Sequence, residues 1–154
     1  MVYRDSKESL FKEGLIKKCP LDYTAIMNLM KRAFIDLKTA SRNIDEDAEC
    51  AYNYAYNAIL RSGLALMFSE GFRPEIKDKH LTVLRFVTII LGDKFKIPVN
   101  NYDFMRRKRH RFIYEPDIPC SKEEAKNALK TAKELADVIR KFIMKKNPQL
   151  EFDF

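Results

Sequence analysis

The chain has 154 residues and a formal net charge of +7, and 46% of its residues are apolar and 33% charged. These values are typical of one globular domain with its own core, and the four Gly and six Pro are too few for an all-β protein rich in tight turns. No run of about 18 apolar residues occurs, so we expect no membrane span. The N-terminus lacks the apolar stretch of a secretory signal, and we expect a cytoplasmic location.

The three cysteines, Cys19, Cys50 and Cys120, lie far apart and form no Cys-x-x-Cys pair. This spacing predicts neither a zinc site nor a disulfide framework. A glycine-rich phosphate loop and a His-Glu-x-x-His zinc motif are both absent from the sequence. We therefore expect no cofactor and no metal.

The N-terminal part predicts two helices. Ser6–Lys18 is expected to form a short helix that lies across the bundle as an arm and stops at Pro20. Asp22 is a suitable N-cap for a longer helix, Tyr23–Arg42, whose apolar residues recur every three or four positions. Its outer face is expected to carry Lys31, Arg32, Asp36 and Lys38.

A third helix, Glu46–Glu70, is expected to begin at an Asp45 cap and to stop before Gly71 and Pro74. It is apolar nearly all round, which is typical of a central helix surrounded by others. A stripe of small residues, which would let a neighbouring helix approach closely, consists of Ala51, Ala55, Ala58, Ser62 and Ala65.

The fourth helix is expected to open at Asp78 and to reach Leu91. Lys94–Asn100 contains Pro98 and is interpreted as a connection. Asn100 or Asn101 would then cap the helix that follows it.

A capping box, Ser121-Lys-Glu-Glu124, predicts the start of a last helix that runs to Lys146. No convincing β signal occurs, so we predict an all-α protein, an antiparallel up-and-down helical bundle with an N-terminal helical arm. We expect a single domain over 1–154, with a core at about 23–146, the arm at 1–22 and a frayed tail at 147–154. Phe152 and Phe154 could dock the tail somewhere.

The segment Met105–Pro116, M-R-R-K-R-H-R-F-I-Y-E-P, holds most of the excess charge. Its five cations are Arg106, Arg107, Lys108, Arg109 and Arg111. They carry +5 of the net +7, which leaves 7 − 5 = +2 for the other residues. A local cation cluster that also holds a His and a Tyr is typical of a site for phosphate or RNA.

Helical geometry singles out Arg109. Each residue advances about 100° around a helix axis. Four apolar residues then share one face: Tyr102, Met105, Phe112 and Ile113. Arg109 falls in the middle of this face, so we expect it to be buried or to lie at an interface, where an unpaired charge is costly. Tyr114 lies about 140° away, so the two meet only if the helix ends between them or a second subunit completes the site. Arg107 and Arg111 lie on or near the opposite side.

The other titratable and aromatic candidates have simpler interpretations. His80 falls in the first turn of the fourth helix and is expected to be a capping or surface residue without metal partners. Tyr52, Tyr54 and Tyr56 could form a base-stacking set. Residues two positions apart on a helix point in different directions, so we expect these tyrosines to pack in the core or at an interface.

Three blocks resemble the HEPN superfamily, whose members are small helical proteins that pair as dimers. Asn53–Pro74 is similar to the central helix of that family and its closing G-x-R-P. Arg109–Pro116, R-H-R-F-I-Y-E-P, resembles the family signature, an Arg, a polar residue, three variable positions and a His or Tyr. Ser121–Ala132 is similar to the closing helix. The likeness spans about Tyr23–Ile143.

The resemblance implies chemistry on RNA. Many members are metal-independent ribonucleases, often toxins of toxin–antitoxin pairs, with the site at the homodimer interface. By this resemblance, Arg109 would bind the scissile phosphate, His110 would occupy the polar position, and Tyr114 would stand where the His is expected. The remaining cations, which would bind phosphate or RNA, are Arg106, Arg107, Lys108 and Arg111.

Two alternatives stay open at the sequence level. In a second register Arg107 is the signature Arg and Phe112 occupies the His position, so the His is missing in both registers. His110 could then act as the base if it faces the cleft. The second function implied by the resemblance is a non-catalytic module that binds nucleotide or RNA and partners a small nucleotidyltransferase, with Tyr114 as a modification target.

Overall fold

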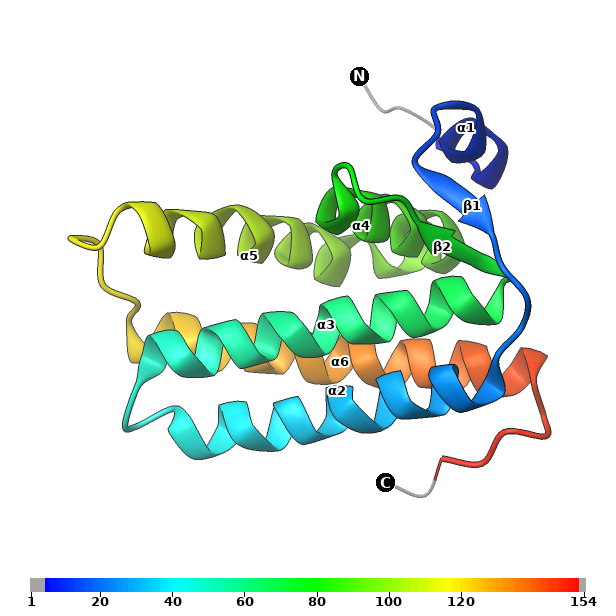
Figure 1. Ribbon diagram of the computed structural model, residues 1–154. Helices are drawn as coiled ribbons and strands as arrows, with labels where there is room; N and C mark the ends of the chain where they lie inside the picture. The colour runs from blue at the N-terminus through cyan, green and yellow to red at the C-terminus, as the bar shows by residue number, and fades with distance from the viewer. Residues whose placement is uncertain (1–4, 153–154) are drawn as a thin grey trace.

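The computed structural model describes residues 5–152 and is a bundle of five long helices. These are α2 (Tyr23–Asn43), α3 (Ala48–Ser69), α4 (Lys79–Leu91), α5 (Lys96–Tyr114) and α6 (Lys122–Lys146). Short connections join the helices, and successive helices run antiparallel except for α3 and α4 (Figure 1). These two run in the same direction, with Tyr56 beside His80 and Gly63 beside Val83. The predicted all-α helical bundle is confirmed.

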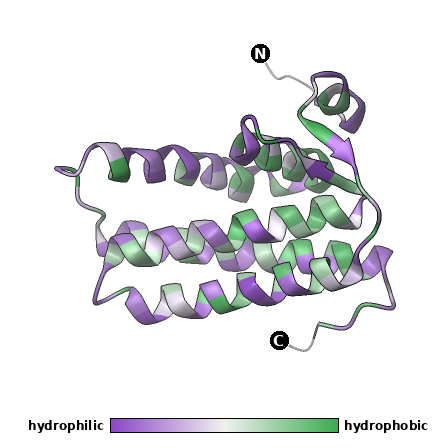
Figure 2. Cartoon of the chain, in the orientation of Figure 1, coloured by the Kyte–Doolittle hydropathy of each residue, from purple (hydrophilic) through white to green (hydrophobic). Residues whose placement is uncertain are grey.

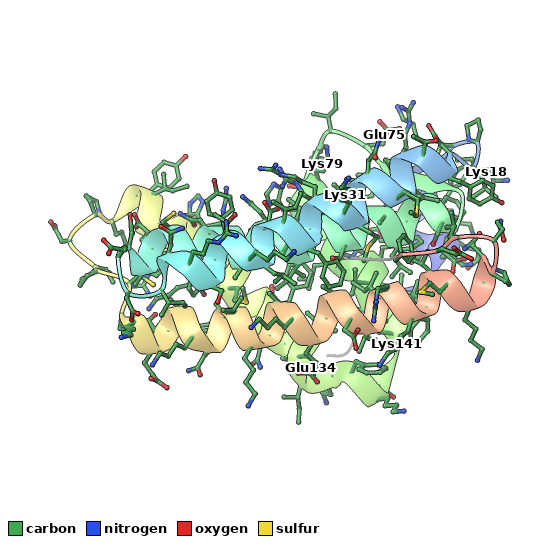
Figure 3. All side chains as sticks on the ribbon, turned by 90° about the horizontal axis from the view of Figure 1, so that it is seen from below. Lys18, Lys31, Glu75, Lys79, Glu134 and Lys141 are labelled. Carbon is green, nitrogen blue, oxygen red and sulfur yellow. The ribbon has the colours of Figure 1, made fainter. Side chains whose placement is uncertain are left out.

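Helix α3 is the centre of the bundle, as predicted, and it contacts each of the other four long helices (Figure 1). The small residues of its predicted stripe are all buried. Small side chains let the helix axes approach, and the larger residues of the neighbouring helices fill the space between them. Helices α2 and α6 lie on the side of the bundle away from α4 and α5. They carry the solvent-exposed Lys31 and Lys141, respectively (Figure 3).

The N-terminal arm differs from the prediction of a helix over Ser6–Lys18. Helix α1 (Lys7–Lys12) is followed by Gly14, whose φ of +73° lies in the left-handed region that favours glycine. Strand β1 (Ile16–Lys18) then pairs antiparallel with β2 (Phe72–Pro74), with Ile16 opposite Pro74. This small sheet is an addition to the predicted all-α fold. No local β signal marks it, because the pairing depends on a partner far along the chain.

The start of α3 also differs from expectation, whereas α4 begins directly after Asp78 as predicted. Asp47 caps α3 through a 3.0 Å bond from Cys50 N, while the predicted cap, Asp45, forms an ion pair with Lys122 of α6. Asp78 holds the N-cap position of α4 but makes no side-chain capping bond.

The basic helix begins earlier than expected. Lys94–Asn100 is not a connection, because η1 (Asp93–Phe95) leads directly into α5 at Lys96. Pro98 is accommodated there because the first turn of a helix has no need of its missing N–H. Asn100 and Asn101 consequently lie inside the helix and do not cap it.

Asp36 is buried and does not lie on the outer face of α2 as predicted. Its carboxylate forms ion pairs with Arg61 of α3 and, at 3.6 Å, with Arg32. Burial is the larger effect on this carboxyl and raises its pKa, although both arginines act to lower it. A buried carboxylate thus links α2 to α3.

Part of the predicted frayed tail is packed. Leu150 and Phe152 are buried against the bundle, while Phe154 lies outside the described residues. Within residues 5–152, no helix is both long and apolar enough to cross a membrane.

The contact between α3 and α4 gives a first prediction. A Cβ added at Gly63 would overlap Val83 Cγ1 and lie 3.1 Å from Val87 Cγ2. Gly63→Ala should lower the free energy of unfolding in urea by about 1 kcal/mol, because overpacking outweighs the better helix propensity of alanine.

Val83→Ala supplies the matched control for this prediction. It removes the methyl group that the new Cβ would meet, so the double variant should be less destabilised than the sum of the single variants. Strict additivity of the two effects would show that the two helices do not meet at this point.

Candidate functional site

Helix α5 lies at the edge of the bundle, and its C-terminal half extends past the start of α4 (Figure 1). Figure 2 shows that the helix is mainly hydrophilic. Tyr102, Met105 and Phe112 are buried as predicted. Ile113, which was expected on the same buried face, is 59% exposed, because α4 does not reach the last turn of α5.

Four of the five cations in the segment Met105–Pro116 have a carboxylate partner. Arg106 and Arg107 both pair with Asp103, at 3.0 and 3.5 Å. The other two pairs are Lys108 with Glu124 of α6, at 3.1 Å, and Arg111 with Glu115, at 2.8 Å. Among residues 5–152, Arg109 is the cation of the cluster for which no carboxylate forms an ion pair.

Arg109 is half-buried, as its place on the helix predicted. Its guanidinium carbon lies 5.1 Å from the centroid of the Tyr56 ring. Its Nε is buried and has no acceptor within the described part of the chain. A ring face attracts a cation but cannot neutralise it, so Arg109 keeps a positive charge that is available to an anion.

Tyr56 is fully buried on α3 and joins Arg109 to His80 of α4. The Tyr56 hydroxyl lies 2.8 Å from His80 Nδ1, within hydrogen-bond distance. The two rings are stacked, with centroids 5.7 Å apart and planes 16° apart. Tyr56 thus contacts both the Arg109 guanidinium of α5 and the His80 imidazole of α4.

These side chains line a pocket of about 590 Å³ on the surface between α4 and α5. Its lining residues are Tyr56, His80, Arg106, Arg107, Arg109, His110 and Arg111. Burial and the nearby Arg109 charge lower the pKa of His80, so its imidazole is neutral at neutral pH. Burial raises the pKa of Tyr56 to about 12, so its hydroxyl keeps its proton.

His110 and Tyr114 form a second aromatic pair on the exposed end of α5. Their ring centroids lie 4.5 Å apart, one helical turn from each other. Tyr114 is 70% exposed and does not line the pocket. Because α5 continues unbroken through Tyr114, Arg109 and Tyr114 point in different directions within one chain.

The predicted site residues are therefore only partly brought together. Arg109 and His110 share the pocket, whereas Lys108 turns toward α6 and Tyr114 stands outside. Sequence reasoning assigned His80 to a capping or surface role, but the residue is half-buried against Tyr56. No local pattern marks this contact, because the two residues belong to different helices.

The pocket suits an anion. It offers arginine N–H donors, a neutral imidazole and an aromatic floor, a set that fits a phosphate group. Within residues 5–152, no group of three or more His, Cys, Asp or Glu side chains is arranged to hold a metal ion.

Residues 26–142 match the model of a protein family described as the HEPN domain. The match covers the bundle from α2 to α6 and includes Tyr56, His80 and Arg109. No curated protein and no solved structure matches the chain significantly.

A comparison of two partly buried arginines, Arg109 and Arg61, gives a second prediction. Arg109→Met should leave the free energy of unfolding unchanged or raise it by up to about 1 kcal/mol, because the buried charge has no ionic partner to lose. Arg61→Met should lower it by roughly 2–3 kcal/mol, because Asp36 would stay buried with only Arg32 nearby.

Urea unfolding of both variants beside the wild type tests this contrast. Equal destabilisation by the two substitutions would mean that Arg109 serves the fold and not a ligand.

Proposed function

This chain belongs to the HEPN domain family, and on that basis we propose that it binds RNA in the Arg109 pocket and cleaves it without a metal, as a toxin-type member. The observation that carries the proposal is the half-buried guanidinium of Arg109, which lacks a carboxylate partner among the described residues. A half-buried charge without an ionic partner lowers the stability of the fold, but it strengthens the binding of a phosphate.

The reaction needs only groups that the chain and the RNA supply. The ribose 2′-oxygen loses its proton and attacks the phosphorus, and the bond to the 5′-oxygen breaks. The products are a 2′,3′-cyclic phosphate and a 5′-hydroxyl, which receives a proton. Arg109 stabilises the negative charge on the non-bridging phosphoryl oxygens, and His110 and Tyr114 move protons. Tyr114 suits proton donation, because its phenolic O–H can give a proton to the leaving 5′-oxygen.

A second copy of the chain completes the cleft in this proposal. Within one chain Tyr114 points away from Arg109. Ile113 and Tyr114 are 59% and 70% exposed beside the pocket, an apolar and aromatic edge that suits an interface. HEPN domains often form dimers, and a two-fold axis at this edge would bring Tyr114 of one copy toward Arg109 of the other.

Arg109→Ala should reduce RNA cleavage roughly 100-fold, because it removes the group that holds charge in the transition state. The assay follows an end-labelled RNA in the presence of a metal chelator and identifies the cyclic phosphate on the product. Arg42→Ala is the matched control, because Arg42 is exposed at the far end of α2 and should leave the rate unchanged.

Tyr114→His adds a gain-of-function arm to the assay. It restores an imidazole at the signature position and should raise the rate near neutral pH. Wild-type cleavage that is lost with the chelator, or that survives Arg109→Ala, would refute the proposed mechanism, as would a strictly monomeric wild type in sedimentation.

A second candidate function rests on the exposure of Tyr114. We propose as the alternative that the chain is the non-catalytic partner of a small nucleotidyltransferase, with the Tyr114 hydroxyl as the acceptor. That oxygen would attack the α-phosphorus of ATP and release pyrophosphate. Its 70% exposure meets the first requirement of such a substrate.

Incubation with such an enzyme and ATP should add one nucleotide to the wild type and none to Tyr114→Phe, as read by intact mass. Tyr23→Phe, which changes another exposed tyrosine, should be modified like the wild type. A nucleotide found on Tyr114→Phe would exclude this alternative.

A further inference from the structure

We propose that Tyr56, His80 and Arg109 form one phosphate site in which His80 takes up a proton as the phosphate group binds. The inference rests on the proposed function, because the site lies in the same pocket. It adds His80, a residue of α4 outside the basic segment, and it assigns to the site a dependence on pH.

The three residues come from three helices that meet at this point. Tyr56 of α3 is the shared floor, with the Arg109 guanidinium 5.1 Å from its ring centroid and His80 Nδ1 2.8 Å from its hydroxyl. Both neighbours line the pocket. An anion that reaches Arg109 therefore arrives beside an imidazole that Tyr56 holds in a fixed orientation.

The charges that face His80 are positive. Lys79 precedes it on α4, and Arg106 and Arg109 approach from α5, while α3 contributes only the neutral Tyr56 hydroxyl. Burial, and after it these cations, lower the pKa of His80 in the free protein. Asp103, the one carboxylate within Lys96–Tyr114, is already paired with Arg106 and Arg107.

A bound phosphate reverses this balance. Its negative charge offsets Arg109 and favours the imidazolium, so the pKa of His80 rises. One proton from solvent converts the His80 imidazole to the imidazolium. Nδ1 then donates to the Tyr56 oxygen, and Nε2 can donate to a phosphate oxygen. The complex thus gains a charge-assisted hydrogen bond that the empty pocket cannot make.

The direction of the pH dependence follows from linkage. Below the pKa of the empty site His80 is charged with or without ligand, and above the pKa of the complex it is neutral in both. Between these two values each complex takes up a proton, so affinity falls as pH rises, by up to roughly tenfold per pH unit.

The chain contains only two histidines, so NMR titration of the imidazole signals follows each ring separately. His80→Gln assigns the signals. The probes are inorganic phosphate and a 2′-O-methyl RNA oligonucleotide, which cannot be cleaved. The pKa of His80 should rise by about one unit with a saturating probe in the wild type and should not rise in Arg109→Gln.

Fluorescence anisotropy with the same oligonucleotide, between about pH 5 and 8, gives a second readout. The wild type should lose affinity as pH rises, and His80→Gln should bind with a much weaker dependence on pH. The NMR titration of the wild type keeps the test valid even if His80→Gln folds poorly.

Each outcome separates this inference from the function on which it rests. A rise with the oligonucleotide alone identifies an RNA backbone as the ligand, and a rise with phosphate alone identifies a free phosphate or nucleotide. Binding that depends on Arg109 while the pKa of His80 stays fixed overturns the inference and leaves RNA binding intact. Absence of binding by both probes removes both.

Discussion

The contact between Arg109 and Tyr56 is the physical constraint on which the rest of the site depends. The Arg109 guanidinium lies on the face of α5 that packs against the bundle, where it needs a contact. The buried Tyr56 ring on α3 provides that contact. The ring holds the cation in place without cancelling its charge. The other four cations of the segment Met105–Pro116 differ because each has a carboxylate close by. Arg109 is therefore the cation of this segment whose charge no carboxylate offsets among the described residues.

The fold and the site use buried charge in opposite ways. Asp36 is fully buried, but Arg61 and Arg32 compensate it, and the result is a link between α2 and α3. Arg109 is less buried and has no ionic partner in the described chain. Compensated charge of the first kind is compatible with stability, whereas uncompensated charge of the second kind is expected where a ligand supplies the missing partner.

Local signals predicted most of the bundle, and distant contacts account for what they missed. The capping box at Ser121 marks the start of α6 correctly because all its bonds lie within one turn. The strand pairing of Ile16 with Pro74 and the bond between Tyr56 and His80 have no local signature. The partial burial of Arg109 could be anticipated from helical periodicity, but its position above a particular ring could not.

The small sheet joins the beginning of the chain to the segment that leads into the pocket. Strand β2 ends at Pro74, and α4 starts at Lys79, one residue before His80. Arg85 of α4 also grips Asp5 and Glu13 of the arm, at 2.8 Å each. The arm therefore helps to hold α4, the helix that carries His80, in place. A change to the arm, such as a protein fused ahead of it, would therefore act on α4 through the contacts of Arg85.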